Sequence, residues 1–140
     1  MRATIGLFVL VLVWPAEAAS QGRHAQRLVD RFVEDHPELV SLELALAGTA
    51  GCRIVAATAR EEVGTMCDNG ELMPMHTGKP HVLPPTKKEP VYGITQAFHD
   101  AKGGVVGAVG MTLKPDAGAN RAAVMRRAAE LLDELERRME

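Results

Sequence analysis

The stretch VSLELALAGTAGCRIVAATA, residues 40–59, decides the fold of this chain. From Val40 to Ala47, leucines recur at every second position, which is the repeat of a strand with one buried face. Residues 48–51 supply a turn that contains glycine, and Arg53 to Ala59 is a second run rich in small apolar residues. The short connection predicts an antiparallel hairpin.

A second hairpin is predicted nearer the C-terminus. Val91 to His99 and Val105 to Lys114 are strand-like apolar runs, and the sequence DAKGG at residues 100–104 joins them. Glycines in this connection accept the positive φ that a tight turn needs. In the last strand, Gly107 and Gly110 leave little side-chain volume on the two faces, which predicts close packing of another element over it.

The segment between the hairpins, Arg60 to Pro90, is long and rich in glycine and proline. A connection of this length is usually functional or mobile. Glu71 to His76 is a candidate short helix, held to one or two turns by Pro74 and ended by Gly78. His81 to Leu83 is a candidate short strand, which brings the predicted sheet to about five strands.

Amphipathic helices are predicted at both ends of the domain. Arg23 to His36 has apolar side chains at helical spacing and ends before Pro37. Residues 119–139 form a final helix, capped by Asn120 or by the earlier Asp116. Its apolar stripe favours packing on the chain's own sheet, with docking on a second subunit as the alternative. The predicted fold class is α+β, a central antiparallel sheet flanked by an N-terminal and a C-terminal helix.

Residues 1–19 have the pattern of a secretory signal peptide. Arg2 gives a basic start, Ile5 to Trp14 is an apolar run, and Ala16-Glu17-Ala18 is a small-residue cleavage pattern. The apolar run has about half of the ~20 residues that a membrane-spanning helix needs, so an uncleaved anchor is the weaker alternative. We therefore expect residues 20–140 to form one soluble domain that is periplasmic or secreted.

Charge and cysteine content narrow the function classes. The formal net charge is −2, and no basic stripe is evident, so a nucleic-acid partner is not expected. Cys52 and Cys67 are the only cysteines. Export to an oxidising compartment favours a disulfide between them, and two separate thiols are the open alternative.

The order helix, hairpin, irregular segment, hairpin carries several local motifs. These are the hairpin of Leu42 to Leu46 with Arg53 to Ala59, the charged-aliphatic-glycine sequence Glu62-Val63-Gly64, the bend Thr77-Gly78-Lys79-Pro80, and the hairpin Phe98 to Gly110. Together they resemble the extracytoplasmic PAS-like sensor modules known as PDC or single Cache domains, over about Arg23 to Lys114. The resemblance implies a PAS-like sheet and a sensor role. Family members usually lie between transmembrane helices and signal to an output module, whereas this sequence ends in the predicted soluble helix, so we expect a free-standing sensor domain.

In a PAS-like domain the irregular segment closes over one sheet face, so polar residues at strand ends and in that segment point into a cavity. On this basis the candidate ligand-binding residues are Thr58, Arg60, His76, His81 and Tyr92. Arg60 suits an anionic group, the histidines donate or accept hydrogen bonds, and Tyr92 offers an apolar face with a hydroxyl. We expect the partner to be a small organic ligand and no cofactor to be bound.

Alternatives to organic-ligand binding remain open. The Met/His/Cys window at residues 66–81 contains soft and imidazole ligands, so a metal or haem site with Met73, Met75 and His76 is the first alternative. The second is an accessory subunit whose C-terminal helix docks on a membrane receptor or on another copy of the chain. No hydrolase, phosphate-binding or dinucleotide motif occurs, which favours a protein without catalytic activity.

Overall fold

The structure, a computed structural model, describes residues 14–116 and 120–140. Residues 1–13 of the predicted signal peptide therefore lie outside the described residues. The elements are, in order, α1 (Trp14–Asp35), β1 (Leu39–Gly48), β2 (Gly51–Ala57), the 3-10 turn η1 (Arg60–Glu62), α2 (Asn69–Thr77), β3 (His81–Leu83), β4 (Tyr92–His99), β5 (Val105–Leu113) and α3 (Arg121–Arg138).

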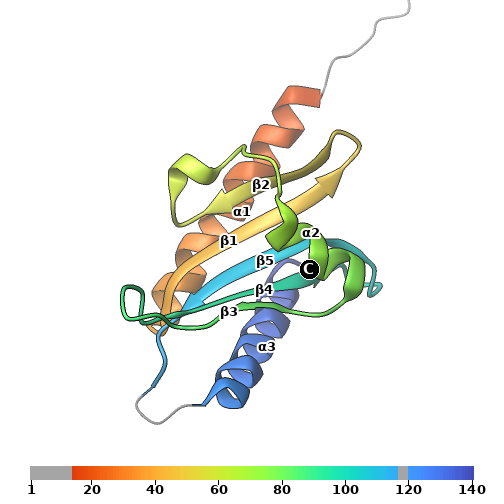
Figure 1. The fold of residues 1–140 in the computed structure, drawn as a ribbon. Coiled ribbons are helices and arrows are strands. Elements are labelled where there is room, and N and C mark those ends of the chain that lie inside the picture. The colour runs from red at the N-terminus through yellow and green to blue at the C-terminus, as the bar shows by residue number, and fades with distance from the viewer. Residues whose placement is uncertain (1–13, 117–119) are drawn as a thin grey trace, which may run out of the picture.

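The described strands form one five-stranded antiparallel sheet in the order β2-β1-β5-β4-β3 (Figure 1). Both predicted hairpins are confirmed, since β1 pairs with β2 and β4 pairs with β5. The central pairing of β1 with β5 joins the two hairpins, although their sequences lie far apart. The predicted α+β class and PAS-like architecture are confirmed.

Helices α1 and α3 cover one face of the sheet, called here the helix face, and lie behind the sheet in Figure 1. Their apolar stripes pack on alternate residues of the strands. The main core is Ala25, Val29, Phe32, Leu39, Leu42, Leu44, Ala56, Ile94, Phe98, Val109, Met111, Leu113, Val124, Ala128, Leu131 and Leu135. Burial of α3 against this core confirms that the final helix packs on the chain's own sheet.

Polar contacts fasten the two helices to each other. His36, which is buried, lies with Nε2 2.9 Å from Glu134 Oε2 and Nδ1 2.7 Å from the carbonyl oxygen of Phe32. Arg138 donates to Asp35 at 2.9 Å, and its guanidinium lies 5.0 Å from the centre of the Phe32 ring. The end of α1 is therefore tied to the end of α3.

Helix α2 and η1 lie over the other face of the sheet, called here the lid face, with α2 in front of the sheet in Figure 1. Asp68 caps α2, and Glu71 completes a reciprocal capping box. Gly78 ends the helix with a φ of 71°, in the left-handed region that glycine accepts. The helix continues past Pro74 to Thr77. A proline at this position removes only one internal hydrogen bond, and the contacts of α2 with β4 and β5 remain.

The N-terminal helix begins earlier than the sequence predicts. The apolar periodicity starts near Ala25, but α1 begins at Trp14, and the alanine-rich residues before Gly22 continue the helix. Alanine has the highest helix propensity, so these residues extend a helix that packing has already fixed. Residues 14–116 and 120–140 contain no helix with the length and hydropathy of a membrane span.

Candidate functional site

The lid face contains a hollow of about 230 Å³, called here the sheet pocket. Its floor is the lid face of β1, β5, β4 and β3, and η1 borders one side. It is lined by Ser41, Leu42, Glu43, Ala59, Glu62, His81, Leu83, Gly93, Ile94, Thr95, Gly110, Met111 and Thr112. Concave sites with a few convergent polar groups are the usual form of small-molecule sites.

Strand register brings these side chains together. Glu43 of β1 lies opposite Gly110 of β5, which in turn lies opposite Thr95 of β4. A Cβ atom on residue 110 would lie 2.8 Å from the Cγ of Glu43, so glycine leaves the space in which the glutamate side chain lies. In the next row Ser41 donates to Thr112 at 2.8 Å. The pocket floor is therefore polar because the strands alternate.

A larger open groove adjoins the sheet pocket. This α2 groove has a volume of about 990 Å³ and runs between α2, the turn after it and β3. It shares His81, Leu83 and Thr95 with the sheet pocket, so the two hollows are contiguous. Met73 and Leu83, whose side chains are 55% and 59% exposed, give the groove an apolar rim.

The rest of the lid face is filled. Under α2, a second apolar cluster contains Ala45, Cys52, Ile54 and Ala57 with Cys67, Leu72 and Met75 packed against it. Helix α2 lies over β4 and β5, and its side chains also fill the space over Ala45 and β2. The hollow remains beside α2, over the part of the sheet that contains Ser41, Gly93 and Thr112. One part of the lid face is therefore filled by side chains, and another part is open.

Three carboxyl groups meet between the sheet and the lid. Burial, together with hydrogen bonds and charge repulsion from Glu62 and Glu71, raises the pKa of Glu43 to about 8. Burial also raises the pKa of Glu71. At neutral pH the Glu43 carboxyl therefore retains its proton and can both donate and accept a hydrogen bond.

The pKa of Asp68, at the cap of α2, shifts in the opposite direction. A hydrogen bond from the carboxyl of Glu71 and another from the backbone N–H of Gly70 lower the pKa of Asp68. The backbone N–H of Asp68 donates to the Glu71 carboxyl at 2.8 Å. The first turn of α2 thereby fixes Glu71 above the sheet, next to Glu43.

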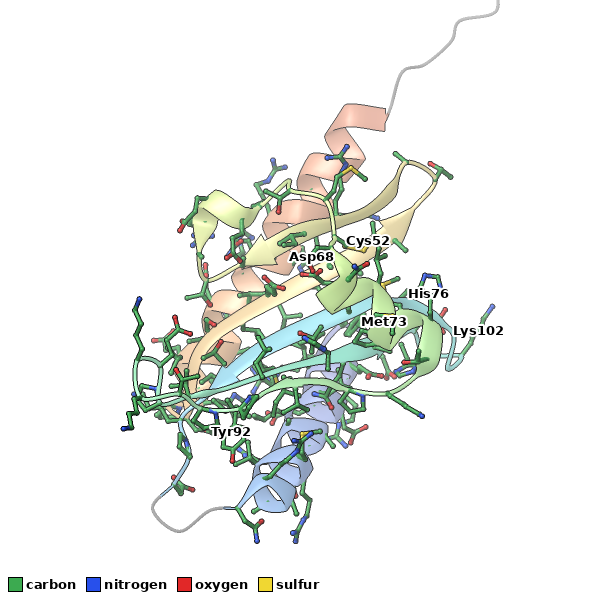
Figure 2. All side chains as sticks on the ribbon, viewed as in Figure 1. Cys52, Asp68, Met73, His76, Tyr92 and Lys102 are labelled. Carbon is green, nitrogen blue, oxygen red and sulfur yellow. A yellow bond between two sulfur atoms is a disulfide. The ribbon has the colours of Figure 1, made fainter. Side chains whose placement is uncertain are left out.

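A disulfide fixes the position of the segment that leads into α2. Cys52 of β2 is bonded to Cys67 in the segment before α2, which is one of the two alternatives that the sequence leaves open (Figure 2). The same segment lies along the outer edge of β2, where Ile54 N donates to Thr65 O and Cys67 N donates to Cys52 O, each at 3.0 Å. Covalent and backbone bonds therefore hold the start of α2 against the sheet.

The structure places the five predicted ligand-binding residues apart. His81 lines both hollows, whereas His76 is exposed on the far part of α2 (Figure 2). Arg60 pairs with Asp30 at 2.8 Å, and the Thr58 hydroxyl bonds to the backbone of Leu42.

Tyr92, the first residue of β4, packs against the main core on the helix face (Figure 2). Of the five candidates, His81 alone lines the sheet pocket. The roles of all five in ligand binding remain predictions.

The alternative metal ligands are likewise dispersed. Met75 is directed at the disulfide, with Sδ 3.9 Å from Sγ of Cys52, whereas Met73 and His76 are exposed. Cys67 is oxidised in the disulfide and presents no thiolate. Within residues 14–116 and 120–140, no group of three or more His, Cys, Asp or Glu side chains has the arrangement of a metal site. Metal binding through this window remains a prediction that no contact in the structure supports.

Sequence reasoning missed Glu43, Glu71 and Thr95. Glu43 and Thr95 each occupy an ordinary polar position of an alternating strand, and Glu71 is the acidic residue of a capping box. A signal was present in Gly110, whose lack of a side chain indicates close packing over the strand. The partner of that packing, Glu43, depends on the long-range β1–β5 register and could not be read from local sequence.

Comparison with known proteins identifies the fold. No protein-family description and no curated protein matches the sequence. Among solved structures, the chain is similar to the GAF domain region of a protein from Geobacter sulfurreducens PCA, with a TM-score of 0.59, 10% identity, and 87% of this chain and 95% of that one covered. It is also similar to the type II free methionine-R-sulfoxide reductase of Thermoplasma acidophilum, with a TM-score of 0.56, 10% identity, and coverages of 85% and 94%. The fold is therefore GAF-like, within the wider PAS-like architecture.

The second comparison corrects one expectation. The absence of hydrolase, phosphate-binding and dinucleotide motifs led us to expect a protein without catalytic activity. That expectation is wrong, because the absence of these motifs does not exclude an enzyme. A protein with the same fold is a methionine-R-sulfoxide reductase. The fold therefore does not exclude catalysis.

Proposed function

We propose that this protein is a small-molecule-binding domain of the sensor type whose ligand occupies the sheet pocket. The observation that carries the proposal is the pocket itself, a hollow of about 230 Å³ over the strands beside η1. It lies on the face of the sheet that the disulfide-fastened α2 segment covers only in part. The helix face has a packed apolar core, and the sheet pocket lies on the opposite, lid face.

The pocket lining supports a compact polar ligand. Its volume equals about eight water molecules at ~30 Å³ each, so the part of the ligand inside it is small. Protonated Glu43, Thr95 and His81 offer both donors and acceptors. The adjoining α2 groove, with Met73 on its rim, gives space for a larger or more apolar extension of the same molecule.

We also propose that the domain acts outside the cytoplasm, as a relative of the PDC or single Cache modules. The signal-peptide pattern of residues 1–19 supports this, and the disulfide is of the kind that persists in oxidising compartments. Mass spectrometry of the protein recovered from the producing cells tests it. An N-terminus near Ala19 in an exported fraction is expected, and an intact Met1 in the cytosol contradicts export.

A thermal-shift screen tests the binding proposal. The probes are amino acids, small organic acids, amines and purines, with Cu(I), Zn²⁺ and haem as the competing class. We expect at least one organic compound to raise the melting temperature in proportion to the logarithm of its concentration. Stabilisation by the metals or haem alone contradicts the proposal.

A pair of variants localises the effect. Thr95→Ile adds side-chain volume on the pocket floor, and Thr49→Ile makes the same chemical change in the exposed turn between β1 and β2. The first is expected to abolish the ligand-dependent shift, and the second is expected to preserve it. Equal responses of both variants would place the ligand elsewhere.

A further inference from the structure

The outer face of α1 carries positive charges that the protein does not neutralise. Arg23, Arg27 and Arg31 recur one helical turn apart, and all three are exposed together with His24. None of the ion pairs in the described part of the chain includes these arginines, whereas Arg60, Arg127, Arg137 and Arg138 each pair with a carboxylate. We call Arg23, His24, Arg27 and Arg31 the basic face.

Folding creates this basic face by diverting the nearby acids. Asp30, three residues after Arg27, accepts from Arg60 at 2.8 Å and from Gln26 at 3.0 Å. Asp35, four residues after Arg31, is held by Arg138. The linear sequence alternates acids and bases here, which is why no basic stripe is evident in it. Tertiary contacts withdraw Asp30 and Asp35 from the arginines, whereas Glu34 stays exposed and forms no ion pair within the described residues.

The repeated arginines lower the stability of α1 and surround a shallow cavity. Like charges four residues apart destabilise an isolated helix, and the basic face contains the pairs Arg23–Arg27 and Arg27–Arg31. A shallow cavity of about 390 Å³ lies among His24, Arg27, Leu28, Arg31 and Arg138. Its apolar floor at Leu28 and cationic rim suit an anion that is attached to an apolar body.

We propose that the basic face of α1 docks on the phosphate headgroups of an anionic lipid bilayer. The cationic rim matches the negative charge of the phosphates, and Leu28 gives the cavity among the arginines an apolar floor. The basic face begins at Arg23 and stays in the chain if residues 1–19 are removed. Each arginine near an anionic surface contributes about fivefold in affinity, which makes the docking reversible.

Nucleic acid is the less suitable polyanion. Proteins that bind duplexes typically neutralise about six to ten phosphates, and the basic face offers three arginines and a histidine. Docking through α1 also leaves the ligand site free, because α1 and the lid lie on opposite faces of the sheet (Figure 1). The bilayer would contact the outer side of α1, and the sheet pocket would remain open to solvent.

Vesicle co-sedimentation of the full chain tests the proposal. The vesicles are phosphatidylcholine alone and equal parts of phosphatidylcholine and phosphatidylglycerol. The double variant Arg27→Glu/Arg31→Glu is compared with Arg121→Glu/Arg126→Glu, which makes the same charge change at exposed arginines of α3. The first is expected to lower binding to anionic vesicles by at least about tenfold, and the control by less than about threefold.

Further arms separate the possible anions. The conservative variant Arg27→Lys/Arg31→Lys is expected to keep the preference for anionic vesicles, which shows that charge and not folding was lost. Equal loss in both glutamate variants, or no preference for phosphatidylglycerol in the parent chain, overturns the proposal. Stabilisation by inorganic phosphate without vesicle binding, or tighter binding of a short DNA duplex than of vesicles, also overturns it.

Discussion

The two faces of the same sheet differ in what covers them and in how completely. On the helix face, α1 and α3 bury a continuous apolar core that includes Phe32, Leu44 and Leu131. On the lid face, β1 presents Glu43 between apolar neighbours, and α2 covers only part of the surface. The comparison shows that the helix face supplies the stability of the domain. That stability allows the lid face to contain a polar hollow.

The difference follows from alternation along single strands. In β1 and β5, every second residue enters the helix-face core, and the residues between them face the lid. A strand built in this way carries a stable scaffold and a binding surface at once. The lid then needs its own fastening, which the disulfide and the cap of α2 provide.

The largest predicted effect lies on the helix face. Phe32→Ala removes a fully buried ring and should lower the free energy of unfolding by about 3–5 kcal/mol. Thr95→Ala on the lid face should cost less than about 1 kcal/mol, because its side chain borders a hollow. Urea unfolding followed by circular dichroism measures both. Similar costs for the two variants would break the comparison between the faces.

The fastening of the lid comes next. Replacing both Cys52 and Cys67 by serine opens a loop with a sequence separation of 15 and should cost about 3 kcal/mol. Hydrogen exchange is expected to rise in residues 60–77 more than in β5. Uniform exchange across both regions would show that the lid does not depend on this bond.

A smaller effect is expected at Gly110. In Gly110→Ala the new Cβ meets the Glu43 side chain, so the variant should lose about 2 kcal/mol and displace that carboxyl. Gly93→Ala is the matched control on β4, since a Cβ there finds its nearest neighbour at an ordinary 3.4 Å. The same urea series distinguishes them, and equal stability of the two variants would contradict the contact between Glu43 and β5.

The smallest effect is a pH dependence. The pKa of Glu43 is about 8 in the folded protein against 4.5 ordinarily, so the folded state holds the proton more tightly. Its contribution to stability is fully present below pH 4.5 and is lost as the pH rises toward 8. Glu43→Gln should therefore be more stable than the parent at pH 8 by about 1 kcal/mol, after allowance for solvent screening, and similar to it at pH 4.5. Parallel stability curves between these pH values would show that Glu43 titrates normally.

Local sequence patterns predicted the elements well, because each has its own physical signature. The leucines of β1 repeat at every second residue, Asn120 caps α3 by accepting from Ala123 N, and Gly78 ends α2. The start of α1 was predicted late, since Trp14 to Gly22 has helix propensity but no core-facing period.

The site was largely missed because it is made by pairing between distant segments. Glu43 meets Gly110 across β1 and β5, and Glu71 reaches Glu43 only after α2 folds back over the sheet. The prediction from residue type favoured histidines and arginines in the irregular segment, of which His81 alone lines the sheet pocket. Long-range register is set by the whole core, and no local window contains it.

The central claim is that a ligand enters the sheet pocket. The most direct test is an NMR titration of the isotopically labelled protein with the organic compound that most raises its melting temperature. We predict that amide shifts concentrate at Glu43, Thr95, Gly110 and their neighbours in β1, β4 and β5. Shifts confined to α1 and α3, or none at saturating compound, would contradict the claim.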